Sequence, residues 1–450
     1  MGRFFKTFLI CAFVLGITSC KDKETSLDGP ADPEGTMATM TPERSKKFLD
    51  ETGQEFLQKF NADDQADLLK LIRYFIDTYG DLEMPENWEV EETETVRGPR
   101  YLLRGLEQAF GYGNSTRAGA TVTTYLYNFD YEDFLGVYTP GNDSWEYAGA
   151  SSNIVFKFKN EAGQDCEIIA QPTRSTQTGT IEWTENDKDS SGNILSSEET
   201  KVEYRAPKSV DLYVNQGNET LVQGKVDVAL DMIAETFDFT VSVSAAKATV
   251  AFKFTGSHTQ VQQASSLAYD GNLLVEELVQ ATGNHFTDIS YIQEIDGRDS
   301  KEVCGEMLRD GKVSVSVLNK VRIDATASYS DALYDAIDFD YDSYTYTSKN
   351  EAEAACKRAC NTLKNSVSAV MRYNNTQTVQ AKLIFNTGFE EWSGGWEYQV
   401  HPLLYFEADG STYEFEDYFE EGFANVQDRW EDLKDAYQTV WDNAKPKTKK

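Results

Sequence analysis

The chain contains one short stretch whose oxygen-bearing side chains are spaced as a calcium site requires. Within residues 187–198, oxygen donors recur at the first, third, fifth, seventh and twelfth positions. Hard oxygen ligands, carboxylates above all, are the ones that Ca²⁺ prefers in proteins. The stretch could therefore surround a calcium ion, with the ligands Asp187, Asp189, Ser191, Asn193 and Glu198.

This spacing resembles the calcium loop of EF-hand proteins, with Gly192 at the sixth position and Ile194 at the eighth. An EF-hand also needs a helix on each side of the loop, whereas residues 180–183 and 201–204 alternate like strands. Hairpin loops rich in Asp, Ser and Gly are common in proteins that bind no metal. We therefore expect a polar hairpin loop, and calcium is the alternative, as a clamp on the hairpin without a catalytic role.

A second candidate site is an aromatic loop formed by Trp392, Trp396 and Tyr398, with two glycines between the tryptophans. Such rings could form a platform on which sugar rings stack. In half-buried antiparallel sheets, however, aromatic side chains usually serve packing and cross-strand pairing. Glycan capture is therefore a secondary hypothesis for this loop.

Nucleophilic and metal-dependent catalysis find little support in the sequence. There is no G-x-S-x-G, H-E-x-x-H or P-loop motif, and His258, His285 and His401 lie far apart along the chain. The 75 Asp and Glu residues could supply a carboxylate pair for glycoside hydrolysis. Their abundance prevents the choice of any pair, so an acid/base glycoside hydrolase is the alternative to a non-catalytic protein.

The N-terminus has the order of a secretory signal, because Arg3 and Lys6 precede an apolar run over residues 8–15. The following residues, Leu-Gly-Ile-Thr-Ser-Cys, end at Cys20 and resemble the lipobox of bacterial lipoproteins. The resemblance implies cleavage before Cys20 and acylation of its thiol, with palmitate among the chains attached. Residues 21–24 look like the charged signal that sends some Gram-negative lipoproteins to the outer face of the outer membrane.

Four other cysteines would remain in the mature chain: Cys166, Cys304, Cys356 and Cys360. An extracytoplasmic location permits disulfides. The last two lie four residues apart on one face of a predicted helix, which disfavours a bridge between them. Pairing with Cys166 or Cys304 and burial as free thiols both remain open.

Composition limits the classes of partner. The chain has 42 Lys and Arg against 75 Asp and Glu, a net charge of −33, which repels phosphate backbones and makes nucleic acid an unsuitable partner. Cleavage before Cys20 would also remove Arg3 and Lys6, lowering the charge to −35. With 40% hydrophobic residues, the chain can bury a substantial core.

Hydrophobic periodicity predicts an α+β fold. Residues from Pro42 and from Asn61 show helical stripes, and a third helix is expected from Pro99 to Phe110. Period-two alternation then predicts a large, mainly antiparallel sheet in the form of a meander, a half barrel or a sandwich. Residues 273–279 fit helix or strand equally. The alternating runs lie at 154–158, 166–170, 210–214, 226–230, 237–243, 250–254, 313–327, 379–385 and 396–400.

Near the C-terminus, apolar residues from Phe419 to Val440 recur every three or four positions, which predicts one amphipathic helix docked on the protein itself. The predicted organisation is a signal peptide at 1–19, a flexible tether at 20–40, a helical segment at 41–112, a β body at 113–416 with an inserted helix near 350–364, a C-terminal helix at 417–444 and a basic tail at 445–450. The expected function is that of a lipid-anchored outer-membrane lipoprotein, at the cell surface or on the periplasmic face, that binds apolar or lipid ligands or has a structural role, without catalysis. Surface glycan binding is the first alternative to this role.

Overall fold

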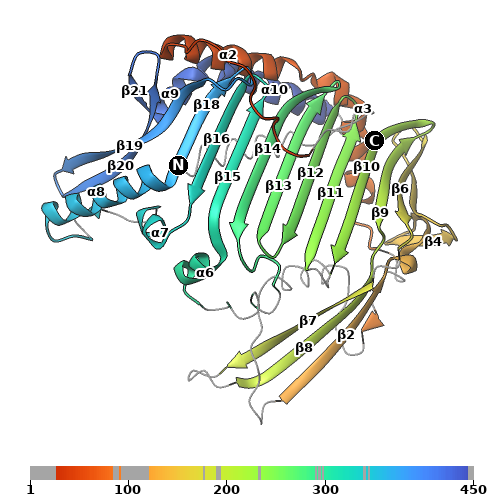
Figure 1. Ribbon diagram of the computed structural model, residues 1–450. Coiled ribbons are helices and arrows are strands. Elements are labelled where there is room, and N and C mark those ends of the chain that lie inside the picture. The colour runs from red at the N-terminus through yellow and green to blue at the C-terminus, as the bar shows by residue number, and fades with distance from the viewer. Residues whose placement is uncertain are drawn as a thin grey trace.

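The computed structural model describes residues 27–84, 91–92, 121–175, 178–188, 194–231, 235–288, 291, 295, 298–337, 341–342 and 345–443. The signal peptide, Cys20, the third predicted helix and the basic tail lie outside the described residues. Within the described part, the chain has the predicted α+β fold (Figure 1).

The first helices begin and end where the sequence places them. Helix α2 (Pro42–Gln58) has a proline in its first turn, where no hydrogen-bond donor is needed. The Asn61 side chain accepts a hydrogen bond from the Asp63 amide at 3.1 Å and so caps the short helix η1 (Ala62–Gln65). Helix α3 (Ala66–Tyr79) follows directly and buries Leu68 and Leu71.

A long sheet forms the body of the protein. Its strands, in chain order, are β3 (Gly136–Pro140), β4 (Trp145–Gly149), β5 (Ile154–Lys159), β6 (Asp165–Thr173), β9 (Ser209–Gln216), β10 (Glu219–Asp231), β11 (Thr236–Ala245), β12 (Ala248–Ser257), β13 (Gln260–Tyr269), β14 (Asn272–Gly283), β15 (Leu308–Val317), β16 (Val321–Ser328), β17 (Tyr341–Asp342), β18 (Val367–Tyr373), β19 (Val379–Trp392), β20 (Gly395–Phe406) and β21 (Thr412–Glu414).

Strands β9 to β16 pair in sequence as an antiparallel meander, as the turn residues predict. Residues 273–279, which the sequence left open, belong to strand β14. Within the described residues no pairing joins the β20–β21 end of the sheet to the β3–β4 end, so the sheet is open. Only the β3–β5 pair is parallel within this sheet.

The two faces of the sheet differ in chemistry. In β11, Phe237, Phe239 and Val241 alternate with Asp238 and Thr240. Residues that are directly paired on antiparallel strands lie on the same face, so the register extends this difference across the sheet. We call the face of Phe239 the apolar face and the face of Asp238 the polar face.

Helices cover the apolar face at one end of the strands (Figure 1). There α2 packs with helices α9 (Phe415–Gly422) and α10 (Ala424–Asn443), while α3 packs on the strands of the β3–β6 end. The buried clusters join helix and sheet residues, among them Leu49, Tyr373, Phe406 and Tyr418 at one end of the sheet, Phe60, Leu267 and Leu274 in the middle, and Leu71, Trp145 and Phe158 at the other end.

The single helix predicted over 417–444 is divided in two in the structure. Helix α9 ends at Gly422, a weak helix former, and Phe423 has φ −120° and ψ 20° before α10 begins. Helix α10 docks on α2 and α3. Its contact with α2 is close, because a Cβ at Gly53 would lie 2.6 Å from Val426. Among the helices that the structure describes, none is long and apolar enough to cross a bilayer.

Three further helices lie toward the opposite ends of the strands: α6 (Ser300–Met307), α7 (Asp331–Ile337) and α8 (Lys349–Ser366). Helix α8 is the predicted inserted helix. Its buried Ala355, Cys356 and Ala359 pack against Tyr398 and Val400 of β20, on the apolar face.

A second, four-stranded sheet contains β1 (Glu91–Glu92), β2 (Thr121–Asp130), β7 (Thr178–Lys188) and β8 (Ile194–Arg205) in the order β1-β2-β8-β7. In Figure 1 it projects beyond the ends of β9 and β10. Strands β7 and β8 form the antiparallel hairpin that the sequence predicts around residues 187–198, and β2 pairs with β8 in parallel.

The predicted flexible tether at 20–40 differs from the structure over its described part. Residues 27–40 cross the sheet to the start of α2 (Figure 1), and backbone hydrogen bonds join Glu34 to Asn375 at 2.8 Å and Gln377 to Gly35 at 3.0 Å. Gly29 has φ +85°, and a Cβ there would lie 2.7 Å from that of Leu278. The local composition suggests a free linker. The contacts that hold the segment come from residues more than 200 positions away along the chain, so the local composition does not reveal them. We call residues 27–40 the N-terminal segment.

Candidate functional site

The half of the apolar face that the helices leave uncovered is the leading candidate for a ligand surface. Three large side chains on it are exposed by more than a third: Leu230 at 39%, Phe254 at 37% and Val279 at 36%. Phe254 pairs with Phe239 across the β11–β12 ladder, and its ring lies 4.8 Å from that of Phe237. We call this group the apolar patch, and define it as Leu230, Phe237, Phe239, Phe254 and Val279.

The register places the apolar patch on the four strands β10, β11, β12 and β14, with Gln263 of β13 between Phe254 and Val279. Leu230 of β10 pairs with Phe237 of β11, and on the far side of Phe254 the next two strands contribute Gln263 and Val279. Contiguous exposed apolar surface on a folded protein commonly marks an interaction site. The patch is therefore suited to an apolar ligand.

One polar pair interrupts the apolar face. Ser265 of β13 donates a hydrogen bond to Glu277 of β14 at 3.0 Å, and the two residues are partners in the register. They lie two pairs further along the ladder from Gln263 and Val279, which is the next position on the same face, beside the apolar patch. A carboxylate at this position disfavours an anionic group on a ligand that occupies the patch.

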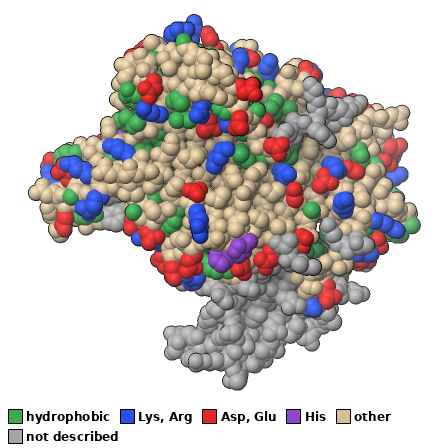
Figure 2. All heavy atoms as spheres, in the orientation of Figure 1, with side chains coloured by type: hydrophobic (Ala, Val, Ile, Leu, Met, Phe, Trp, Pro, Cys, Tyr) green, Lys and Arg blue, Asp and Glu red, His purple; other side chains and the backbone are tan. Residues whose placement is uncertain are grey.

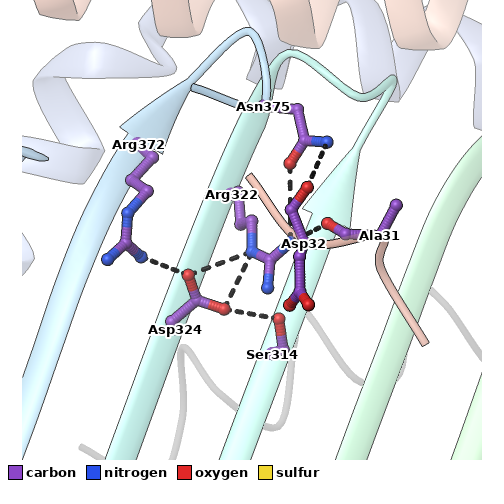
Figure 3. A network of polar contacts seen from close by, with 7 residues as sticks. All are labelled: Ala31, Asp32, Ser314, Arg322, Asp324, Arg372 and Asn375. Atoms are coloured by element: carbon purple, nitrogen blue, oxygen red, sulfur yellow. Dashed lines mark hydrogen bonds and ion pairs between the residues drawn. The ribbon is translucent and has the colours of Figure 1, made fainter. Parts of the chain in front are cut away.

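On the polar face, a buried network holds the N-terminal segment (Figure 3). Arg322 is 4% exposed and donates to both carboxylate oxygens of Asp324, at 2.8 and 3.0 Å, and to the carbonyl of Ala31. Arg372 and Ser314 also donate to Asp324. Because these donors converge on its carboxylate, Asp324 has a structural role in fixing the N-terminal segment.

Glu276 of β14 is the one carboxyl group among the described residues whose pKa is clearly raised. Burial raises its pKa, and the charge of Arg322 opposes the rise. Its neighbours across the ladders are Ser266 and Ser316. Glycoside hydrolysis also needs a second carboxyl group opposite the first, whereas serines occupy the positions beside Glu276 on the two neighbouring strands.

A cavity of about 280 Å³ lies where β18 and β19 separate. Its lining is mostly apolar, with Val367, Leu383, Ile384 and Phe385, beside the polar Lys364 and Asn386. This volume is slightly below the range of typical small-molecule pockets. The apolar patch presents a wider surface for a chain-like ligand.

Two histidines that are distant in the sequence lie together in the structure. His258 occupies the two-residue turn between β12 and β13, and His285 follows β14. One ligand atom each from His258, His285 and Asp288 lie within 4.8 Å of one another. No spacing along the sequence indicates this group, because it is the β12–β14 register that brings the two histidine rings together.

No protein-family model matches the chain. The comparisons with curated proteins and with solved structures likewise give no match. Function must therefore be inferred from the chemistry of the chain's own surfaces.

The predicted aromatic platform is not a single surface. Trp396 pairs with Glu391 in the β19–β20 hairpin, so it lies on the apolar face with Phe389 and Tyr398. Trp392 is the next residue along β19 and lies on the opposite face. The sequence suggested proximity because only a short glycine turn separates the tryptophans, whereas strand alternation separates their rings.

The side chains of the predicted calcium loop lie outside the described residues. The structure does place residues 187 and 198 on the two strands of the β7–β8 hairpin, where Asp187 pairs with Ser196 and Glu185 with Glu198. The flanking elements are thus strands, unlike those of an EF-hand, as the sequence predicts. Calcium binding by the loop is still a hypothesis, which the melting temperature with and without a chelator would test.

The four described cysteines are free thiols. Cys166, Cys356 and Cys360 are buried, and burial raises the pKa of Cys356 to about 11. Of the alternatives that the sequence left open, the structure has burial as free thiols for Cys166, Cys356 and Cys360, whereas Cys304 is a half-buried free thiol. The role of the three buried thiols is in packing, since a neutral buried thiol behaves as a small apolar side chain.

Proposed function

We propose that the protein is a lipid-anchored extracytoplasmic lipoprotein of the outer membrane that binds an apolar ligand non-catalytically on the apolar patch. The ligand class is a lipid with a long acyl chain and an uncharged or zwitterionic headgroup. The observation that carries the proposal is the exposure of Leu230, Phe254 and Val279 on one continuous face.

The chemistry of the apolar face supports this class of ligand. Each CH₂ group transferred from water to an apolar surface contributes about 0.8 kcal/mol, so an acyl chain gains binding energy along its length. Glu277 beside the patch and the net charge of −33 both disfavour an anionic headgroup. Attachment through Cys20 would keep the chain at a membrane, where such ligands are concentrated.

The anchor can be tested through Cys20 itself. Expression in a Gram-negative host with labelled palmitate is expected to label the wild-type chain and to place it in the membrane fraction. Cys20→Ala is expected to remove the label, and Cys11→Ala, which changes a cysteine within the predicted signal peptide, is the matched control. Retained labelling in Cys20→Ala would refute the anchor without affecting the ligand proposal.

The apolar patch can be tested with two lysine substitutions on one strand. Phe254→Lys places a charge on the apolar face, whereas Thr255→Lys places the same charge on the polar face. With the neutral fluorescent probe N-phenyl-naphthylamine, we expect Phe254→Lys to weaken binding at least about tenfold, because the desolvated ammonium opposes apolar contact. Thr255→Lys should leave binding within about twofold of the wild type.

Native mass spectrometry supplies an independent measurement. The wild-type chain is expected to copurify with lipid, and Phe254→Lys is expected to carry less of it. A wild-type spectrum without bound lipid, together with equal probe binding by the two lysine variants, would exclude the ligand proposal.

A further inference from the structure

A second feature of the structure points to a metal ion, and it does not depend on the proposed ligand. His258 and His285 are two of the three histidines in the chain, and Asp288 lies beside them. Figure 2 shows histidine side chains gathered at the lower edge of the face in view, among acidic side chains. No other group of three or more such residues is close enough to hold an ion within the described part of the chain.

Backbone hydrogen bonds fix the two loops against each other. The Phe286 amide donates to the His258 carbonyl at 3.2 Å, and the Gly283 amide donates to the Thr259 carbonyl at 2.9 Å. The end of β14 is thereby held against the β12–β13 turn. The relative position of the two histidines is thus set by main-chain contacts as well as by the side chains.

His285 is held in an unusual conformation. Its φ is +63°, in the left-handed region that bulky residues rarely adopt. Its ring stacks on Tyr291 with centroids 4.3 Å apart, and the Tyr291 hydroxyl donates to Glu306 at 2.6 Å. Backbone strain of this kind is frequent at functional sites, where surrounding contacts hold it in place.

The ligand pair has a separation suited to a metal ion. His285 Nδ1 lies 3.0 Å from Asp288 Oδ2. Two ligands at about 2.0–2.1 Å from a tetrahedral ion are about 3.3 Å apart, so an ion fits between this nitrogen and oxygen with little movement. Asp288 Oδ1 accepts a hydrogen bond from the Tyr291 amide at 3.0 Å, which orients the carboxylate.

One further observation favours a ligand at this place. His258 is exposed, so its ring can move toward an ion at small energetic cost. The remaining coordination positions would be open to solvent.

We propose that His258, His285 and Asp288 bind a divalent transition-metal ion of the zinc class through two imidazole nitrogens and one carboxylate oxygen. Imidazole ligands select such ions over Ca²⁺ and Mg²⁺, which prefer sites made of oxygen. When Nδ1 of His285 binds the ion, the neutral ring carries its proton on Nε2.

Titration of the untagged full-length chain with Co²⁺ tests the proposal, because Co²⁺ reports its coordination by visible absorption. We expect one equivalent to bind, Zn²⁺ to displace it, and excess Ca²⁺ to leave it in place. His258→Ala and His285→Asn should each weaken binding by about 100-fold or more, since each removes a nitrogen ligand. Asparagine is chosen at position 285 because it tolerates a left-handed backbone.

His401→Ala is the matched control. His401 is the third histidine and also has a carboxylate nearby, with Nδ1 3.5 Å from Glu414. Its removal should leave Co²⁺ affinity unchanged. Absence of Co²⁺ binding in the wild type would overturn the proposal, as would equal affinity in the wild type and His258→Ala, or an equal loss in His401→Ala. Equal melting temperatures with chelator would establish that the variants are folded.

Discussion

At the scale of single residues, the polar face depends on a few buried charges. Asp324 accepts hydrogen bonds from Arg322, Arg372 and Ser314, and Arg322 also holds the carbonyl of Ala31 (Figure 3). A buried guanidinium is stable only when its charge is matched, so the carboxylate of Asp324 is the centre of the network. The sequence contained no sign of this role, because the partners come from separate strands and from the N-terminal segment.

Asp324→Asn should destabilise the fold strongly. The substitution keeps the shape of the side chain but leaves two guanidinium groups without their counter-charge, and we expect a loss of about 3 kcal/mol in the free energy of unfolding. Urea denaturation measures this change. Asp310→Asn, an exposed change on the same face of the sheet, is the control and should have little effect. Similar midpoints for the two variants would contradict the structural role of Asp324.

At the scale of elements, the N-terminal segment is part of the folded body. Gln380 of β19 is fully buried, and its side chain accepts from the Met40 amide at 2.7 Å and donates to the Ala38 carbonyl at 3.4 Å. Thr378 makes a second bidentate contact, with Met37. The segment therefore joins α2 to the hairpin between β18 and β19.

Gln380→Ala should release the N-terminal segment. Loss of the buried Gln380 amide removes both hydrogen bonds to the segment, which costs about 2 kcal/mol and favours local opening. Limited proteolysis should then cut within residues 27–40 faster than in the wild type. Gln377→Ala, an exposed change three residues away, should leave the cleavage rate unchanged. Equal protection of the segment in both variants would show that its side-chain contacts are dispensable.

The docking of α10 gives the fold a dependence on alkaline pH. Burial, with a smaller effect from the charge of Asp64, raises the pKa of Tyr437 to about 12 from its ordinary value of 10.0. The folded state thus favours the neutral phenol. Its stabilising contribution is complete below pH 10 and is lost as the pH rises from 10 toward 12.

Tyr437→Phe should therefore reduce the loss of stability at high pH. We expect the free energy of unfolding of the wild type to fall more steeply than that of the variant between about pH 10 and 12. Other buried tyrosines still titrate in the variant, so the slope should become smaller but not vanish. Tyr147→Phe, which changes an exposed tyrosine, is the control. Parallel pH profiles for Tyr437→Phe and the wild type would disprove the effect.

At the scale of the whole molecule, two properties occur together: the sheet has a partly exposed apolar face, and the chain as a whole is strongly acidic. Helices bury the apolar face at one end of the strands and leave the apolar patch at the other (Figure 1). The net charge of −33 adds long-range repulsion of anions. If the apolar patch binds the lipid that we propose, these two properties together predict selection against anionic headgroups.

Glu277→Gln should relax this selection. For lipids with the same acyl chain, we expect the wild type to bind a phosphatidylcholine more tightly than a phosphatidylglycerol at low salt, and the difference to shrink as salt screens the charges. Glu277→Gln should reduce the difference in affinity between the two lipids at every salt concentration. Glu167→Gln, on the polar face of β6, is the control. A preference that is unaffected by Glu277→Gln would place the headgroup elsewhere.

The sequence by itself determined many of the elements of this protein. Period-two alternation specified most strands of the meander, and Pro42 at the first helical position and the cap at Asn61 specified where the first helices begin. The strand-like flanks of residues 187–198 distinguished a hairpin from an EF-hand. These features depend on local backbone preference and on which side of a strand each residue lies, and both can be read within a short window of sequence.

Only the tertiary structure decided which residues meet. The β12–β14 register joins His258 to His285, strand alternation separates Trp392 from Trp396, and the β18–β19 hairpin holds the N-terminal segment. Helix packing at one end of the strands decides which part of the apolar face is left exposed. Such contacts join residues that are distant along the chain. They depend on strand register and helix packing, and neither can be derived from the periodicity of a single strand or helix.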